Sequence, residues 1–142
     1  MADEVAQVGT VTLAGAHGAL VACLADAERL GVSCCAAVGD RAGNLLAFAR
    51  MDGAPLMSAQ IAQDKAYTVA AFGLHTHDWW ALLEDDPALL HGIVKTDRLT
   101  IFGGGIGITS GDAMVGAVGV SGGSSQQDRE IAEAGAAALS PS

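Results

Sequence analysis

The chain has 142 residues, of which 51% are hydrophobic and 16% are charged, a composition that excludes a disordered protein. Sixteen acidic residues against seven basic ones give a net charge of −9, and no cluster of Lys and Arg is present, so neither nucleic acid nor an anionic membrane surface is an expected partner. The acidic start Met1–Glu4 lacks the positive region of a signal peptide, and no run of about 18 apolar residues could span a membrane. We therefore expect a cytoplasmic protein.

The first half of the chain predicts a helix, a hairpin and a second helix. Apolar residues recur at helical spacing over Thr12–Leu30. The short apolar stretches Val32–Val38 and Leu45–Arg50 flank the turn-forming segment Gly39–Asn44 and indicate an antiparallel hairpin. A second helix is expected over Met57–Phe72, where an apolar stripe again follows helical spacing.

The second half begins with a less regular connector. His75–Asp86 is polar and contains two tryptophans, with a short helix expected at Asp78–Leu83. Pro87–Arg98 shows no firm hydrophobic period. This part of the chain therefore predicts a variable segment rather than a core element.

Three strands and a helix are expected after the connector. Short apolar runs predict strands at Leu99–Phe102, Ile106–Thr109 and Ala113–Val120. The pattern Ser125–Asp128 is interpreted as a capping box, which starts a last helix over about Gln126–Leu139. The tail Ser140–Ser142 is expected to be frayed.

This order of elements indicates the fold class. Strands joined by hairpins argue against a doubly wound parallel sheet. We expect a single α+β domain over residues 1–142, with helices on the faces of an antiparallel sheet. The three cysteines, Cys23, Cys34 and Cys35, have no metal-binding spacing and are expected to be unpaired core thiols.

The junction Gly119–Ser125 between a strand and a helix is a candidate anion site. Glycine permits close backbone approach, and a helix start offers unpaired N–H groups and a partial positive charge. Ser121, Gly122 and Gly123 would then contact a carboxylate or phosphate. Alternatively the junction is a tight turn in which Asp128 itself takes the place of the anion.

A second glycine cluster lies at Gly103–Gly105. Three consecutive glycines are costly to order, so something must approach this backbone closely. Either another segment of the chain or a ligand could sit there, and in the second case Gly104 and Gly105 would contact the ligand.

Two basic residues are candidates for holding an anion. Arg50 could bind a carboxylate with both arms of its guanidinium, or it could be an ordinary surface arginine at a turn. Lys65, beside Asp64, falls in the apolar stripe of the second helix. It is either an anion anchor or general base, or a lysine whose stem is covered and whose head is exposed.

The histidines suggest a metal, although weakly. His75 and His77 are close in sequence, but no further His or Cys falls at a spacing that completes a zinc site. His17 lies beside the apolar stripe of the first helix. Such a residue is usually structural, yet it is also of the type that can bind haem iron.

Several motifs together resemble the GlcG/HbpS-like family, which is also known as the haem-degrading domain family and includes the C-terminal domain of PduO-type proteins. The similarity extends over about Leu13–Ala138. The motifs that carry it are Asp40–Leu45, Arg50–Ala54, Asp64–Thr68, Phe102–Gly105 and Gly116–Gly123 with Gln127 and Asp128.

The resemblance implies a profilin-like or PAS-like domain with an antiparallel sheet of about five strands. It also implies assembly as a homo-oligomer. Some members bind haem, and in some of these the iron ligand is a histidine on the first helix, the element that carries His17 here. The resemblance therefore makes haem a possible cofactor.

Three functions remain open. The first is a small ligand-binding protein for haem, another tetrapyrrole or an anionic organic ligand, in which Arg50, Asp64 and His75 contact the ligand with the glycines. The second is a lyase, hydratase or isomerase for an organic acid, with Lys65, Asp52 and His77 as acid and base groups. The third is a purely structural oligomer. We favour the first, and whether the protein catalyses a reaction stays open.

Overall fold

The computed structural model describes residues 3–139, so the predicted frayed tail at 140–142 lies outside the described residues. The elements in chain order are α1 (Leu13–Leu30), β1 (Cys35–Asp40), β2 (Leu45–Arg50), α2 (Ser58–Phe72), the 3-10 helix η1 (Thr76–Asp78), α3 (Trp79–Leu83), α4 (Pro87–Ile93), β3 (Gly105–Ser110), β4 (Ala113–Ser121) and α5 (Ser125–Ala137).

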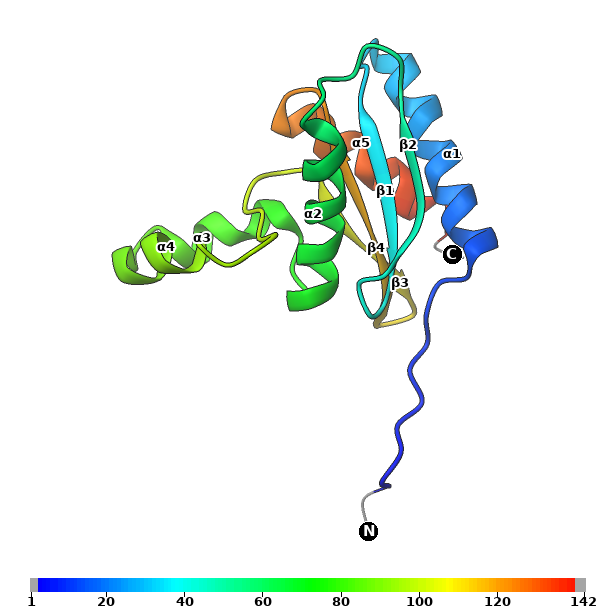
Figure 1. Cartoon of the computed structure of the whole chain (residues 1–142). Coiled ribbons are helices and arrows are strands. Elements are labelled where there is room, and N and C mark those ends of the chain that lie inside the picture. The colour runs from blue at the N-terminus through cyan, green and yellow to red at the C-terminus, as the bar shows by residue number, and fades with distance from the viewer. Residues whose placement is uncertain (1–2, 140–142) are drawn as a thin grey trace.

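The strands form one antiparallel sheet in the order β2-β1-β4-β3. Helices α1 and α5 cover one face of this sheet and α2 covers the other (Figure 1). The α+β class, the hairpin β1–β2 and the helices on the sheet faces are therefore confirmed. The sheet has four strands in the described part of the chain, against about five expected.

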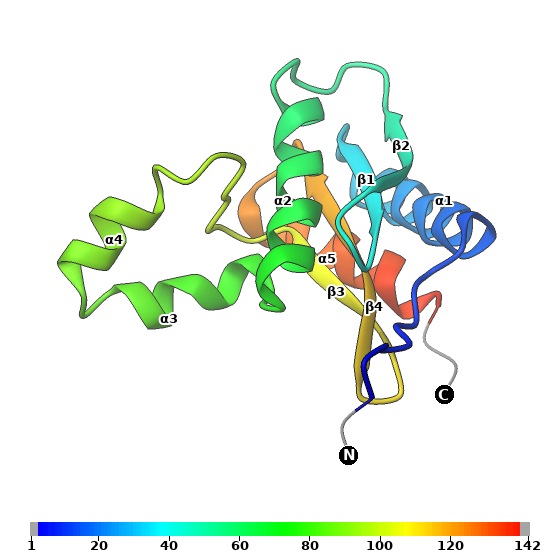
Figure 2. The same cartoon turned by 60° about the horizontal axis from the view of Figure 1, so that its bottom comes forward.

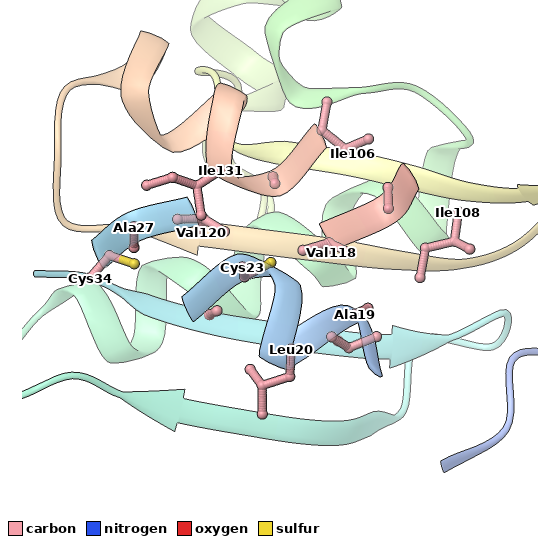
Figure 3. Close-up of a cluster of buried hydrophobic side chains, with 14 of the residues drawn as sticks. Ala19, Leu20, Cys23, Ala27, Cys34, Ile106, Ile108, Val118, Val120 and Ile131 are labelled. Atoms are coloured by element: carbon pink, nitrogen blue, oxygen red, sulfur yellow. The ribbon is translucent and has the colours of Figure 1, made fainter. Parts of the chain in front are cut away.

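The central strand β1 is buried on both faces, which explains its unbroken run of apolar residues. Ala36 and Val38 point toward α1 and α5, whereas Cys35 and Ala37 point toward α2. The larger core lies on the α1/α5 side, where Figure 3 shows side chains from both helices meeting those of β1, β3 and β4. The alternation of side chains along β1 thus decides on which face of the sheet each residue packs.

The three cysteines are free and fully buried, as expected of core thiols. Burial raises the pKa of Cys23 to about 12 and that of Cys34 to about 11. Because the thiolate is the reactive form, both sulfurs act as apolar core atoms at neutral pH.

The connector forms an arm that projects from the body of the domain (Figures 1 and 2). Its base is anchored by Thr76 and Trp79, which are buried, and Trp79 packs edge-on against Phe72 of α2. Farther out, α4 has no buried residue. The predicted short helix at 78–83 is present as α3, while α4 was not expected because its sequence has no clear period.

One predicted strand and two predicted boundaries differ from the structure. Leu99–Phe102 is not a strand, because Thr100 donates its N–H to the Thr68 hydroxyl of α2 instead of to a neighbouring strand. The capping box begins one residue earlier than expected, at Ser124, whose hydroxyl accepts the N–H of Gln127 at 3.1 Å. Strand β1 also begins later than Val32, because residues 32–34 form the crossing from α1 into the sheet.

No helix among residues 3–139 combines the length and the apolar composition that crossing a membrane would need.

The packing of α2 on the sheet predicts a severe effect for Gly119→Ala. A Cβ at this position would lie 1.9 Å from the carbonyl oxygen of Ala62 and 2.6 Å from the backbone nitrogen of Ala66. Since backbone atoms cannot move aside cheaply, we expect the free energy of unfolding to fall by about 3 kcal/mol or more in urea denaturation.

The matched control is Gly18→Ala in the exposed part of α1, where an added Cβ meets nothing within 4 Å. Alanine has a higher helix propensity than glycine, so this variant should gain about 0.5–1 kcal/mol of stability. Equal stability of the two variants would contradict the described contact between α2 and β4.

Candidate functional site

Lys65 occupies the centre of the candidate site and is fully buried. Its position on the sheet-facing side of α2 carries its Nζ through the layer to β4, where it donates to the carbonyl oxygen of Val120 at 2.8 Å. The same Nζ lies 3.3 Å from Oδ2 of Asp128 and 4.8 Å from the centre of the Phe102 ring. Burial lowers the pKa of Lys65, and the charge of Asp128 opposes this shift.

Asp128 fills the role of an anion at the junction between β4 and α5. Its Oδ1 accepts the N–H of Gly123 at 2.8 Å while its Oδ2 faces Lys65. The structure therefore agrees with the second interpretation of this junction, a tight turn in which the Asp128 carboxylate takes the place of an anion. Ser121 is buried at the end of β4, opposite Cys35 of β1.

The glycines of the site make close contacts with the protein's own chain. A Cβ at Gly122, whose φ is +146°, would lie 2.6 Å from the carbonyl oxygen of Ser33. A Cβ at Gly104, whose φ is +128°, would lie 2.5 Å from the carbonyl oxygen of Val120 and 2.6 Å from Nζ of Lys65. Both glycine stretches thus meet around the Lys65–Asp128 pair, and the chain itself fills the space between them.

The connector histidines lie at the edge of the sheet. His75 Nδ1 accepts the N–H of Gly107 at 3.1 Å, and the hydroxyl of Thr76 accepts the N–H of Gly105 at 2.8 Å. These side chains satisfy two outward-facing donors of the edge strand β3, which would otherwise be open to pairing. This role of residues 75–76 was not predicted, because nothing in the sequence indicates that they return to β3.

His77 stacks on His75 with ring centres 5.4 Å apart. Burial lowers the pKa of His77, the charge of Arg129 lowers it further, and the charges of Asp78 and Glu133 oppose the shift. His77 also lines an open groove of about 480 Å³ along the start of α5, together with Gly103, Ser125, Gln126, Arg129, Glu130 and Glu133.

Arg50 and Asp52 belong to a different groove, between α1 and the end of β2. This groove has a volume of about 580 Å³ and is lined by Val21, Leu24, Ala25, Glu28, Arg50, Met51 and Asp52. Arg50 donates through Nη2 to the carbonyl oxygen of Ala54 and is otherwise exposed. His17 is exposed on α1, one helical turn before Val21.

The predicted site residues therefore fall into separate groups. Lys65, the glycines and Ser121 lie around Asp128 in the interior, and Arg50 and Asp52 share the α1/β2 groove. His75 covers β3, and His77 stacks on it beside the groove along α5. Asp64 lies on the outer side of α2, where it binds Arg98. Within residues 3–139, no three His, Cys, Asp or Glu side chains are grouped so as to hold a metal ion.

The buried pair predicts that Asp128→Ala is strongly destabilising. The substitution leaves the Lys65 ammonium buried with no opposite charge and the Gly123 N–H with no acceptor, so the free energy of unfolding should fall by about 3–5 kcal/mol. The double variant Lys65→Met/Asp128→Ala should recover part of this loss in chemical denaturation, because it removes both charges.

Glu133→Ala on the same helix is the control, since Glu133 forms only an exposed pair with Arg129. Its removal should change stability by at most about 1 kcal/mol. If Asp128→Ala costs no more than Glu133→Ala, the buried pair does not stabilise the fold.

Comparison with known proteins places this chain among proteins of similar length and shape. An uncharacterised 15.0 kDa protein of Citrobacter freundii, from the dhaT-dhaS intergenic region, is 39% identical over 129 residues, which cover 89% of this chain and 90% of the relative. The crystal structure of Klebsiella pneumoniae protein ORFY has a TM-score of 0.90 and 31% identity, covering 98% of this chain and 97% of that one.

A crystal structure of a PduOC–haem complex is also similar, with a TM-score of 0.82, 29% identity, and coverage of 91% of this chain and 94% of that chain. The family model described as haem-degrading protein HbpS-like matches residues 11–137. This match extends over all the described elements from α1 to α5 and confirms the resemblance found in the sequence motifs. The protein therefore belongs to the HbpS-like family of haem-degrading proteins.

Proposed function

We propose that the protein binds haem, or a closely similar anionic tetrapyrrole, in the groove between α1 and β2. The arrangement that carries this proposal is a groove with a partly apolar wall, a histidine one turn beyond one end and an arginine at the other, where Glu28 and Asp52 also line it. A haem site needs the same three features, which are an apolar wall for the macrocycle, an axial ligand for iron and a cation for the propionates.

His17 lies on the helix face that lines the groove. Its spacing to Val21, Leu24 and Glu28 is four, seven and eleven residues, which places all four on one side of α1. At 1.5 Å per residue, His17 and Leu24 are about 10.5 Å apart along the helix axis. The imidazole is exposed, and a single histidine suffices as the protein ligand of haem iron.

The other end of the groove supplies the charge. Arg50 contacts the Ala54 carbonyl oxygen through one nitrogen, and its remaining donors have no partner among residues 3–139. A guanidinium with free donors matches a propionate carboxylate in shape and charge. Val21, Leu24 and Met51 between the two ends provide apolar contact.

Bound haem would supply a redox-active iron, while the chain itself supplies the ligand, the wall and the cation. The likeness to the PduOC–haem structure, at 29% identity, supports this group over other anionic ligands. The donor set of His17 and Arg50 supports haem, because it offers one nitrogen ligand and one anion partner at the two ends of a groove whose wall includes Val21, Leu24 and Met51.

An acid–base enzyme receives less support from the geometry. Asp52 and His77 line different grooves, and Lys65 is buried in a third place against Asp128. General acid–base catalysis requires its groups within hydrogen-bond reach of one substrate. We therefore retain ligand binding as the proposed function.

Hemin titration followed by absorption spectroscopy tests the haem proposal. Wild-type protein should shift the Soret band of hemin, and His17→Ala should abolish this shift because iron loses its ligand. Arg50→Gln should weaken binding about tenfold, which corresponds to the loss of a charged hydrogen bond worth about 1.5 kcal/mol. His91→Ala, at an exposed histidine of α4, is the control and should bind like wild type.

A spectrum identical to that of free hemin would overturn the haem proposal. A loss of binding in His77→Ala with normal binding in His17→Ala would move the site to the connector and would also contradict the α1/β2 groove.

We also propose that the protein forms a homo-oligomer through the α3–α4 arm. Four large apolar side chains of this arm and its exit are exposed, namely Trp80, Leu82, Leu89 and Val94. Seven residues are too few for a helix that is stable on its own, and none of those in α4 is buried, so packing against a second copy would stabilise it.

Sedimentation equilibrium tests this proposal. Wild-type protein should be larger than a monomer, and Leu82→Glu should shift it toward the monomer because a charge is placed in the contact. Leu56→Glu, at an exposed leucine away from the arm, should keep the wild-type mass. A monomeric wild-type protein would refute the proposal.

A further inference from the structure

A small cavity lies on the outer side of α2, away from the α1/β2 groove. The segment 96–99, which returns from the arm, passes over α2 and encloses a volume of about 180 Å³. Aromatic and aliphatic side chains form much of its wall, and one arginine belongs to it. Its lining residues are Tyr67, Thr68, Ala71, Phe72, Thr96, Asp97, Arg98 and Leu99.

Arg98 adopts a backbone conformation that arginine rarely takes. Its φ of +64° is the only positive φ of a non-glycine residue in the described chain. Glycine or asparagine usually occupies such a left-handed position after a helical turn, and an arginine there is strained. The chain therefore holds Arg98 in a costly conformation that sets the direction of its side chain.

The guanidinium of Arg98 is fixed by two contacts. Its Nε donates to Oδ1 of Asp64 at 3.0 Å, and its Cζ lies 3.9 Å from the centre of the Tyr67 ring. The same oxygen of Asp64 also accepts a hydrogen bond from Gln60 at 2.8 Å. The two terminal nitrogens of Arg98, Nη1 and Nη2, have no partner among residues 3–139, so one edge of the guanidinium remains free.

The backbone around Arg98 is anchored as well. The hydroxyl of Thr68 lies 3.0 Å from the carbonyl oxygen of Arg98 and accepts the N–H of Thr100, also at 3.0 Å. Thr68 is itself buried in α2. A single hydroxyl thus ties the backbone that follows Arg98 to the helix, which holds this wall of the cavity against α2.

We propose that this cavity binds small aliphatic monocarboxylates. The carboxylate would accept two hydrogen bonds from Nη1 and Nη2 of Arg98, the geometry that a guanidinium favours. A short hydrocarbon tail would lie against Ala71, Phe72 and Leu99. The volume of about 180 Å³ limits the ligand to a few carbon atoms.

The charges around the cavity restrict the ligand further. Asp64 already neutralises one edge of the guanidinium, and Asp97 adds a second negative charge to the lining. A dicarboxylate would place its second charge near these groups or in the apolar wall. The site should therefore prefer monoanions and bind them more weakly as salt concentration rises.

Titration with acetate, propionate and butyrate, followed through the amide chemical shifts of residues 96–99, tests this proposal. The affinity for the acid should increase about fourfold with each methylene until the cavity is full, because each added methylene is transferred from water to the apolar wall. Butanol has the same tail without the carboxylate and should bind much more weakly than butyrate.

Two variants test the carboxylate contact and the space for the hydrocarbon tail separately. Arg98→Gln should bind acetate and butyrate with at least tenfold lower affinity, because both acids lose the guanidinium contact. Ala71→Leu should remove the preference for butyrate over acetate, because its larger side chain occupies the space of the tail. His17→Ala, which tests the haem groove, should bind butyrate like wild type, so failure of one site leaves the other assignment standing.

The proposal is overturned if the segment shows no shift with any of the acids, if butanol binds as well as butyrate, or if Arg98→Gln binds butyrate with wild-type affinity. Because Arg98→Gln also loses the contact with Asp64, thermal unfolding of each variant establishes that it is folded before its binding is compared. If Arg98→Gln does not fold, the loss of chain-length dependence in Ala71→Leu decides the question.

Discussion

The ion pair between Lys65 and Asp128 is the interaction on which the interior of this protein depends. It joins α2 to α5 across the end of β4, and each partner has a second contact with backbone, at the carbonyl of Val120 and the N–H of Gly123. A buried charge without a partner is strongly destabilising. Both helices must therefore take up positions that keep the ammonium and the carboxylate together, and the glycines at 104 and 122 let the backbone close around them.

Because this interior is closed, both proposed ligand sites lie at the periphery of the domain. The glycine stretches at 103–105 and 119–123 are the features of the sequence that most resemble a ligand site, yet they serve contacts within the chain. Open volume lies along the start of α5, where Gly103 lines a groove, along α1 and β2, and on the outer side of α2. The proposed haem groove and the proposed carboxylate cavity thus lie on opposite faces of the sheet and do not compete.

The few cations of this acidic protein have specific positions. Lys65 neutralises Asp128 in the interior, and Arg41 donates to a backbone carbonyl near the end of α2. Arg29 and Arg129 form exposed ion pairs, which contribute little to stability. Arg50 and Arg98 keep free guanidinium donors beside the proposed haem groove and the proposed carboxylate cavity. In a chain of net charge −9, each of these cations offers an anion a positive partner among neighbouring carboxylates.

Local signals in the sequence determined the class of fold and the family. Helical periodicity over α1 and α2, the turn between β1 and β2 and the motifs from Asp40 to Asp128 all depend on residues close to one another in the chain. Leu99–Phe102 illustrates the limit, because its apolar residues resemble a strand while the Thr68 hydroxyl, some 30 positions away, takes its N–H. Tertiary structure alone decided that Asp128 forms an ion pair with Lys65, that His75 covers β3, and that Arg98 lines a cavity. Each of these contacts joins segments that are distant in sequence, and no local pattern records which distant partner a polar side chain will meet.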